Sequence, residues 1–259
     1  MQVLWNTLKN GLKAYCDKNG FDKVILGLSG GLDSALTAVL AADALGGQNV
    51  TALMMKTRFT SDLSLQIAHQ IAAMNGLNYQ KIDIDPIFEK EVDFLRDVFK
   101  EDVKGIVQEN LQARIRGQIL MAYSNQFGCL VLACGNKSEI LTGYCTLYGD
   151  TCGGLAPIGN VYKTTIFELA KWRNNLSRAL PDEVITRAPS AELATGQKDE
   201  NTLPPYSVLD AILKELYDNK KTLSELVDKG YDKKTVLRVQ NLIEKSAFKR
   251  RQLAETIQI

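Results

Sequence analysis

Apolar residues in the first half of the chain alternate between two spacings. Short runs typical of buried or half-buried strands cover residues 23–28, 50–55, 79–84 and 129–133. Segments with helical spacing cover residues 3–19, 34–45, 61–75 and 103–127, and Gly20 and Gly76 follow two of them as helix ends. The order strand, helix, strand predicts a parallel sheet with right-handed crossovers and helices on both faces.

The second half of the chain has a different texture. Residues 136–163 are rich in Gly, Thr and Tyr, and residues 187–205 form a polar loop with three prolines. Helical spacing returns at residues 167–174, 206–217 and 233–245, and residues 248–251 form a basic end. We therefore expect an α/β fold with a helical C-terminal part. No linker is evident, so we expect one domain over residues 1–259.

Composition narrows the class of protein. The chain has 259 residues, 45% of them hydrophobic, and its 31 Lys and Arg balance 30 Asp and Glu, which leaves a net charge of +1. This balance gives no global field that would attract nucleic acid or a membrane. No apolar stretch reaches the ~20 residues of a membrane span, and the first 15 residues lack a signal-peptide core. We expect a cytoplasmic protein with no membrane partner.

Histidine and cysteine offer little chemistry in this sequence. The only histidine, His69, lies within a helical run and away from every motif, so a histidine base or a zinc site is not expected. The five cysteines are an odd number, and no pair has CxxC spacing. We expect reduced thiols.

The sharpest local signal is the glycine-rich segment 27–34, GLSGGLDS, which follows a strand and opens a helix. Its glycines let successive N–H groups turn toward a phosphate, and the helix N-terminus favours negative charge. Ser29 and Ser34 can donate hydroxyls, whereas Asp33 suits Mg²⁺ bound to phosphate. The spacing is neither that of a Walker A loop nor GxGxxG. A plain strand-to-helix turn with Asp33 as its N-cap is the structural alternative.

Four separated motifs carry a family resemblance. SGGLDS resembles the pyrophosphatase loop of the N-type ATP pyrophosphatases, which include GMP synthetase, asparagine synthetase, tRNA-thiolating enzymes and NAD synthetase. ENLQARIRG at 109–117, GNKSEILTGYCTLYGDTCGG at 135–154, PSAEL with LPPYSVLD within 188–209, and KRR at 249–251 together resemble NAD synthetase, from about Leu8 to Gln252. The details are closest to the synthetase domain of glutamine-dependent enzymes, although we find no amidase domain in this chain.

This resemblance implies an activity. A Rossmann-like sheet of the adenine nucleotide alpha hydrolase type would bind Mg²⁺ and ATP and amidate deamido-NAD with ammonia through an NAD-adenylate, releasing AMP and pyrophosphate. The expectation is an ammonia-dependent NAD synthetase that forms a homodimer, with the helix at 109–123 as a candidate interface. The alternatives are a synthetase subunit that needs a separate amidase partner, another ligase with the same loop, or a non-catalytic nucleotide-binding subunit. The even charge balance argues against a nucleic-acid partner.

The resemblance also assigns residues. Asp33, Glu139 and Lys163 are the expected catalytic residues, and Asp33 and Glu139 are the expected Mg²⁺ ligands. The expected ATP-binding residues are Gly27, Leu28, Ser29, Gly30, Gly31, Leu32, Asp33, Ser34, Cys134, Lys163 and Ser190. The expected deamido-NAD contacts are Asn110, Arg114, Glu139 and Lys249.

Each assignment has a structural alternative. Glu139 could stabilise a helix N-terminus, Lys163 could be a solvated lysine, and Ser190 could be a loop cap. Asn110 and Arg114 could form a polar cluster within one helix, and Lys249 could be a basic helix end. Two positions also depart from the family pattern, because Cys134 stands where many relatives have Thr and Phe248 stands where many have His.

Overall fold

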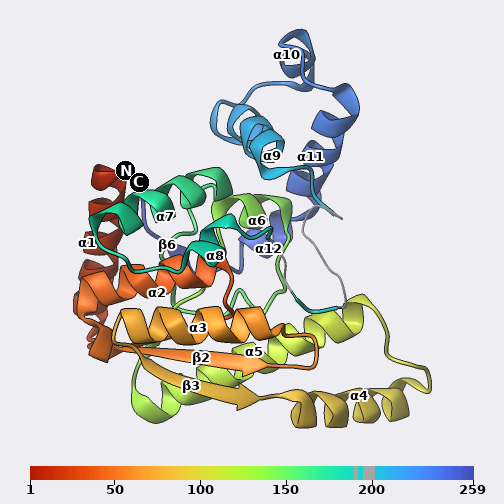
Figure 1. The fold of residues 1–259 in the computed structure, drawn as a ribbon. Coiled ribbons are helices and arrows are strands. Elements are labelled where there is room, and N and C mark those ends of the chain that lie inside the picture. The colour runs from red at the N-terminus through yellow and green to blue at the C-terminus, as the bar shows by residue number, and fades with distance from the viewer. Residues whose placement is uncertain (190–191, 195–201) are drawn as a thin grey trace.

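A four-stranded parallel sheet with strand order β3-β2-β1-β4 forms the centre of the molecule (Figure 1). The computed structural model describes residues 1–189, 192–194 and 202–259. The strands are β1 (Val24–Gly27), β2 (Val50–Lys56), β3 (Asn78–Asp83) and β4 (Leu130–Val131). Val24 pairs with Val50 on one side and with Leu130 on the other, both in parallel. The predicted parallel sheet is confirmed.

Helices cover both faces of this sheet. Val24 and Leu26 of β1 belong to the apolar core of one face, whereas Ile25 between them belongs to the core of the other. The first face packs against α1 (Gln2–Asn19), α2 (Leu32–Leu45), α3 (Asp62–Met74) and α7 (Lys163–Leu176). The second face packs against α4 (Asp85–Phe99) and α5 (Ile106–Phe127). Alternating burial on two covered faces explains the continuous apolar runs in the sequence.

Some boundaries differ from the sequence expectation. The helix predicted from residue 103 begins at Ile106, because Gly105 before it has φ +56°, a left-handed conformation that a helix cannot include. The strand predicted over 129–133 is only two residues long. Beyond it the chain turns to a second sheet, where Ala133 N donates to Leu155 O at 2.9 Å. Helix α4 (Asp85–Phe99) lies in a segment for which no element was predicted.

That second sheet joins β5 (Leu155–Ala156) to β6 (Glu255–Thr256) in parallel. Asn160 Nδ2 donates to Thr256 Oγ1 at 2.9 Å and to Ile257 O at 2.8 Å. These bonds connect residues 256 and 257 to the segment that follows β5. No helix in the described part of the chain is both long and apolar enough to cross a membrane.

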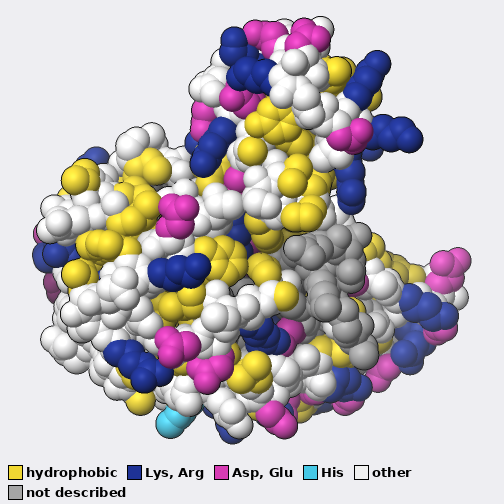
Figure 2. All heavy atoms as spheres, turned by 45° about the horizontal axis from the view of Figure 1, so that its top comes forward, with side chains coloured by type: hydrophobic (Ala, Val, Ile, Leu, Met, Phe, Trp, Pro, Cys, Tyr) yellow, Lys and Arg dark blue, Asp and Glu magenta, His cyan; other side chains and the backbone are white. Residues whose placement is uncertain are grey.

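The C-terminal part is helical, as expected, and has its own apolar core. After η1 (Gly47–Asn49), the remaining elements are α6 (Lys137–Thr142), α8 (Asp182–Thr186), α9 (Tyr206–Leu213), a π-helical turn (Lys214–Asp218), α10 (Leu223–Asp228), α11 (Lys233–Lys245) and α12 (Ala247–Arg250). Helices α9, α10 and α11 project from the body (Figure 1). Positive and negative side chains are interspersed on the face shown in Figure 2, in keeping with the even charge balance.

Candidate functional site

The glycine-rich segment lies between β1 and α2, at the carboxyl edge of the sheet. Gly30 has φ +83°, and a Cβ there would lie 2.4 Å from Ser64 O, so only glycine fits. Gly31 N donates to Ser29 Oγ at 3.2 Å, and Ser34 Oγ donates to Gly31 O at 3.0 Å. The two hydroxyls therefore organise the loop through its own backbone.

Asp33 is not the N-cap of α2. Gly31 occupies the N-cap position, and Asp33 lies in the first turn. The Asp33 carboxylate instead binds partners far along the chain: Oδ1 accepts from Asn136 Nδ2 at 2.9 Å, and Oδ2 pairs with the Lys163 ammonium. The N-cap alternative for Asp33 is therefore wrong, and its carboxylate is available to a site across the sheet edge.

Asn136 is a site residue that the sequence expectation missed. It is fully buried and caps α6, since Asn136 Oδ1 accepts from Glu139 N at 3.0 Å while Glu139 Oε2 accepts from Asn136 N at 3.3 Å. Glu139 Oε1 also lies 3.9 Å from Lys163 Nζ. Glu139 thus stabilises a helix N-terminus and faces the charged cluster at once. The capping pattern N-x-x-E in NKSE was the signal for Asn136.

Lys163 joins the two carboxylates. It is the first residue of α7, its side chain is 3% exposed, and its ammonium pairs with Asp33 and Glu139. The Tyr206 ring centre lies 5.5 Å from Nζ. The surface-lysine alternative is wrong. The structure thus brings Asp33, Glu139 and Lys163 together beside the glycine loop, as the sequence predicted.

The cluster can hold a cation by its carboxylates. Asp33 and Glu139 present oxygen atoms to one positive charge, the Lys163 ammonium. Two carboxylates together with phosphate oxygens are a usual ligand set for Mg²⁺. Within the described ranges, no three or more His, Cys, Asp or Glu side chains gather into a metal site.

Cys134 follows β4 and lies near this cluster. Its thiol is 3.9 Å from Leu132 O, and burial raises its pKa to about 12, so the sulfur stays protonated. Burial also raises the pKa of Cys145 to about 12 and raises the pKa values of the other three thiols, Cys16, Cys129 and Cys152. All five cysteines are free thiols, as expected.

The expected deamido-NAD residues gather around one segment, residues 143–148. Thr146 Oγ1 donates to Asn110 Oδ1 at 2.7 Å, and Arg114 Nε donates to Leu147 O at 3.2 Å. Lys249 Nζ donates to Gly143 O and Cys145 O at 2.8 and 2.7 Å. Asn110 and Arg114 on α5 therefore bind residues 146 and 147, just before Tyr148. Lys249 binds the backbone directly after α6.

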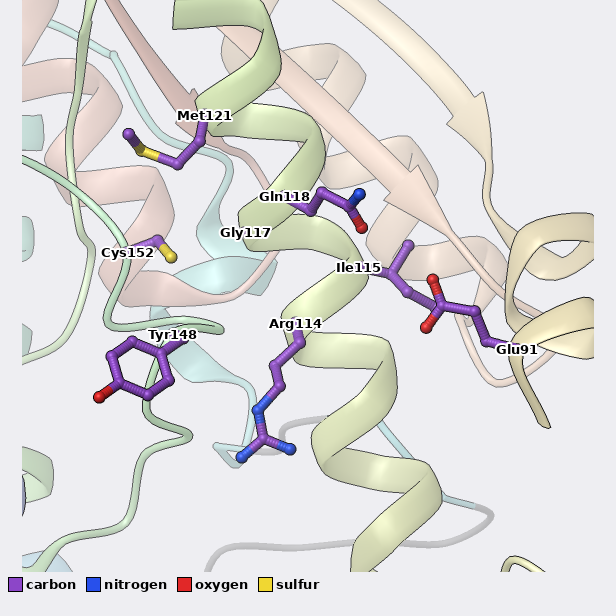
Figure 3. Close-up of a pocket in the computed structure, with 8 residues that line it drawn as sticks. All are labelled: Glu91, Arg114, Ile115, Gly117, Gln118, Met121, Tyr148 and Cys152. Carbon is purple, nitrogen blue, oxygen red and sulfur yellow. The ribbon is translucent and has the colours of Figure 1, made fainter. Parts of the chain in front are cut away.

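A pocket of about 270 Å³ borders this segment. Figure 3 shows Arg114 and Met121 on α5, with Tyr148 and Cys152 on the facing loop. Gly117 lies in the wall, where a Cβ would come within 2.7 Å of Tyr148 O. The close packing of helix and loop leaves the guanidinium of Arg114 at the edge of the pocket.

Glu192 of the PSAEL motif is bonded to the start of α3. The Glu192 carboxylate accepts from Ser61 Oγ at 2.8 Å and pairs with Arg187, whose Nη1 donates to Ser64 Oγ at 2.7 Å. These hydrogen bonds outweigh burial and lower the pKa of Glu192. Because Ser64 also contacts Gly30, the segment is connected to the glycine loop. Ser190 itself lies outside the described residues.

Comparisons with known proteins agree on one family. The family model described as NAD synthase matches residues 4–253. A glutamine-dependent NAD(+) synthetase of Synechocystis sp. is 46% identical over 258 residues, which are 100% of this chain and 46% of the relative.

Solved structures give the same result. The glutamine-dependent NAD+ synthetase from Acinetobacter baumannii in complex with ADP matches with a TM-score of 0.70 and 42% identity, over 99% of this chain and 46% of that one. The NH3-dependent NAD synthetase from Campylobacter jejuni, in complex with nitrate, matches with a TM-score of 0.79 and 30% identity, over 99% and 98%. The chain thus spans about half the length of its glutamine-dependent relatives.

Proposed function

Because the chain belongs to the NAD synthase family, we propose that residues 1–259 act as a synthetase unit that amidates deamido-NAD to NAD with ATP and ammonia. The observation that carries the proposal is the cluster of Asp33, Glu139 and Lys163 beside a glycine loop. Such a cluster has no histidine or free thiolate nucleophile. It suits a reaction in which phosphate charge is neutralised and two substrates are aligned.

The proposed reaction has two steps. A carboxylate oxygen of the nicotinate group attacks the α-phosphorus of ATP, and the bond to the bridging oxygen breaks so that pyrophosphate leaves. The nitrogen of ammonia then attacks the carbonyl carbon of the adenylate, AMP leaves with the electron pair of the C–O bond, and the amide nitrogen releases a proton. The Lys163 ammonium is placed to stabilise the negative charge that develops on pyrophosphate.

Asp33 and Glu139 are the proposed ligands of Mg²⁺. Their carboxylates already share a positive charge, that of Lys163, so the cluster is built to accept a cation. When bound, Mg²⁺ would supply neutralisation of the phosphate oxygens. Lys163 would contact the phosphates beside these two carboxylates.

The remaining assignments follow the layout of the site. We assign the glycine loop, Cys134 and Ser190 to ATP, and Asn110, Arg114, Glu139 and Lys249 to deamido-NAD. We assign the dinucleotide to the pocket beside Arg114 and Tyr148, while Glu139 lies outside the lining of that pocket.

We propose a homodimer that buries the outer face of α4 and α5. Phe94 is 66% exposed and Ile106 is 64% exposed, and Val98, Phe99 and Phe127 are also more than half exposed. Apolar residues gathered on two adjacent helices indicate an interaction surface. Sedimentation of the chain and of Phe94→Glu tests this surface, since the variant should be a monomer and an unchanged dimer would exclude the face.

An assay of the purified chain tests the function. We expect NAD and AMP in equal amounts from ATP, Mg²⁺, deamido-NAD and an ammonium salt. Glutamine alone should give NAD only if the chain acts with an amidase. AMP without NAD would indicate adenylation with a missing nitrogen donor or a different acceptor. The absence of AMP with either donor would contradict the proposal and favour a non-catalytic role or another substrate.

A further inference from the structure

Helix α9 of the C-terminal part carries a carboxylate that is almost fully buried. Asp210 is 1% exposed and lies beside Leu209, Ile212 and Leu213, which belong to the apolar core of this part. Removing a carboxylate from water costs several kcal/mol unless its oxygens are well bonded. Among the described residues, no lysine or arginine forms an ion pair with Asp210, so neutral donors must satisfy it.

Both oxygens of Asp210 are directed at the start of α7. Oδ1 accepts from Ser138 Oγ at 2.5 Å, and Oδ2 accepts from Thr164 N at 2.8 Å. Ser138 Oγ in turn accepts from Lys163 N at 2.9 Å. The carboxylate therefore serves the first two N–H groups of α7, one directly and one through a hydroxyl. These N–H groups have no partner within their own helix.

Helix α9 also contacts the ammonium of Lys163, through the ring of Tyr206. Tyr206 precedes Asp210 by four residues, which places both on one face of α9. The Tyr206 ring centre is 5.5 Å from Lys163 Nζ, so α9 approaches the Lys163 ammonium directly and reaches the Lys163 backbone nitrogen through the Ser138 hydroxyl. Ser138 also precedes Glu139 directly in α6. A single carboxylate thus links α9 to the two elements that carry Glu139 and Lys163.

We propose that Asp210 is a positioning residue for the ATP-dependent step. It holds the starts of α6 and α7 together, so that Glu139 and Lys163 meet Asp33 at the glycine loop. This inference rests on the proposed function, in which Lys163 acts on the phosphates. The helical C-terminal part then contributes to the reaction through orientation, without contact between Asp210 and a substrate.

Asp210→Asn tests the inference, because asparagine has the same shape as aspartate but carries no charge. The amide oxygen can still accept from Thr164 N, but Nδ2 has to donate to Ser138 Oγ, so this bond reverses its direction and both bonds lose the charged acceptor. We expect kcat for AMP formation to fall about tenfold to hundredfold, because lysine placement depends on these charge-assisted bonds. KM for deamido-NAD should stay within about twofold, since three of its four expected contacts, Asn110, Arg114 and Lys249, bond to residues 143–147 and not to Asp210. Amide hydrogen exchange at Thr164 should speed up about tenfold, which is measurable without turnover.

Two further variants make the test specific. Ile212→Val is the control, since Ile212 is buried on the same helix but does not contact Lys163 or Ser138 through the bonds described; it should lower the melting temperature and leave kcat unchanged. Ser138→Ala removes the donor to Asp210 Oδ1 and the acceptor of Lys163 N together, so it should lower kcat at least as much as Asp210→Asn, with a smaller effect in the double variant than the sum. Ser138→Ala also serves if Asp210→Asn does not fold.

The outcomes separate the two proposals. An inactive wild-type chain means that the proposed function, and with it the positioning role, fails. An active wild type with unchanged kcat and unchanged Thr164 exchange in Asp210→Asn overturns the positioning role alone. An equal loss of kcat in Ile212→Val would also overturn it, because any loosening of α9 would then suffice.

Discussion

Helices α2 and α7 are joined by an ion pair at each of their ends. Asp33 and Lys163 pair at the start of the two helices, and Asp43 and Arg173 pair near the end. On each helix the second residue follows the first by ten positions, a rise of about 15 Å. The same two helices therefore offer two ion pairs in different surroundings.

The two pairs differ in how fully their groups are bonded. Arg173 donates from Nε and Nη2 to the two oxygens of Asp43, at 2.7 and 2.9 Å, and from Nη1 to Ser177. Trp5 Nε1 also donates to Asp43 Oδ2 at 3.1 Å. The planar guanidinium of Arg173 donates from all three of its nitrogens, so it fixes the positions of the two helices. The ammonium of Lys163 is a compact charge without a fixed donor plane, so it can exchange partners. The comparison separates a pair that fixes two helices from a pair whose partners can change, which is what the role proposed for Lys163 requires.

Asp33→Asn should have the largest effect. The amide keeps the shape but loses the charge that a cation needs, so NAD formation should fall at least about a thousandfold. The melting temperature should change by no more than a few degrees, because the lysine keeps Glu139 nearby. Turnover assays measure the loss of NAD formation, and thermal unfolding measures the change in melting temperature. Unchanged turnover in folded protein would contradict the metal assignment.

Asp43→Asn should lower stability and leave turnover unchanged, the opposite of Asp33→Asn. It leaves the Arg173 guanidinium, which is 8% exposed, without its counter-charge, at a cost of about 3 kcal/mol in free energy of unfolding. Turnover per folded molecule should equal that of the wild type, since Asp43 is ten residues from Asp33. Urea unfolding measures the loss, and a large fall in kcat would show that the two ends are coupled.

Arg173→Lys tests whether the planar guanidinium, and not its charge alone, stabilises the pair with Asp43. The lysine keeps the positive charge but cannot make the two-pronged bond to Asp43 and the bond to Ser177 together. We expect a loss of about 1–2 kcal/mol in the free energy of unfolding. Arg178→Lys on the exposed surface is the control and should be neutral. Equal stability of the two variants would mean that charge alone matters at this end.

Glu192→Gln should give the smallest effect, and one that depends on pH. Since the folded-state pKa of Glu192 is lowered, its contribution to stability is present above the unfolded-state pKa and is lost as pH falls through the folded-state value. The variant should be less stable than the wild type by about 1 kcal/mol at pH 7, with the gap closing in acid. Urea unfolding at pH 7 and at pH 4 and below measures the gap, and a constant gap would exclude the charge as its cause.

Patterns that are local in the sequence predicted the sheet and the core of the site. The apolar runs predicted β1, β2 and β3, and the glycine spacing predicted the loop at Gly30, because each depends on neighbouring residues. The motifs also located Asp33, Glu139 and Lys163, whose meeting in space the structure adds.

Contacts between distant side chains could not be predicted in this way. Asp210 is 46 residues from Thr164, and Asp43 is 130 residues from Arg173. Nothing near either aspartate in the sequence indicates its partner, because each contact exists only once the helices have packed. The early end of β4 has the same origin, since Ala133 pairs with a strand that forms much later in the chain.

The raised pKa values of the five thiols have a consequence for reactivity. The thiolate is the form that peroxide and alkylating reagents attack, and at neutral pH little of it exists when the pKa lies far above that range. Cys134 and Cys145 lie on either side of Glu139 along the chain, and both should react slowly with iodoacetamide. The site can therefore keep its sulfur atoms through oxidative stress, when an exposed low-pKa cysteine in the same place would be converted to sulfenic acid.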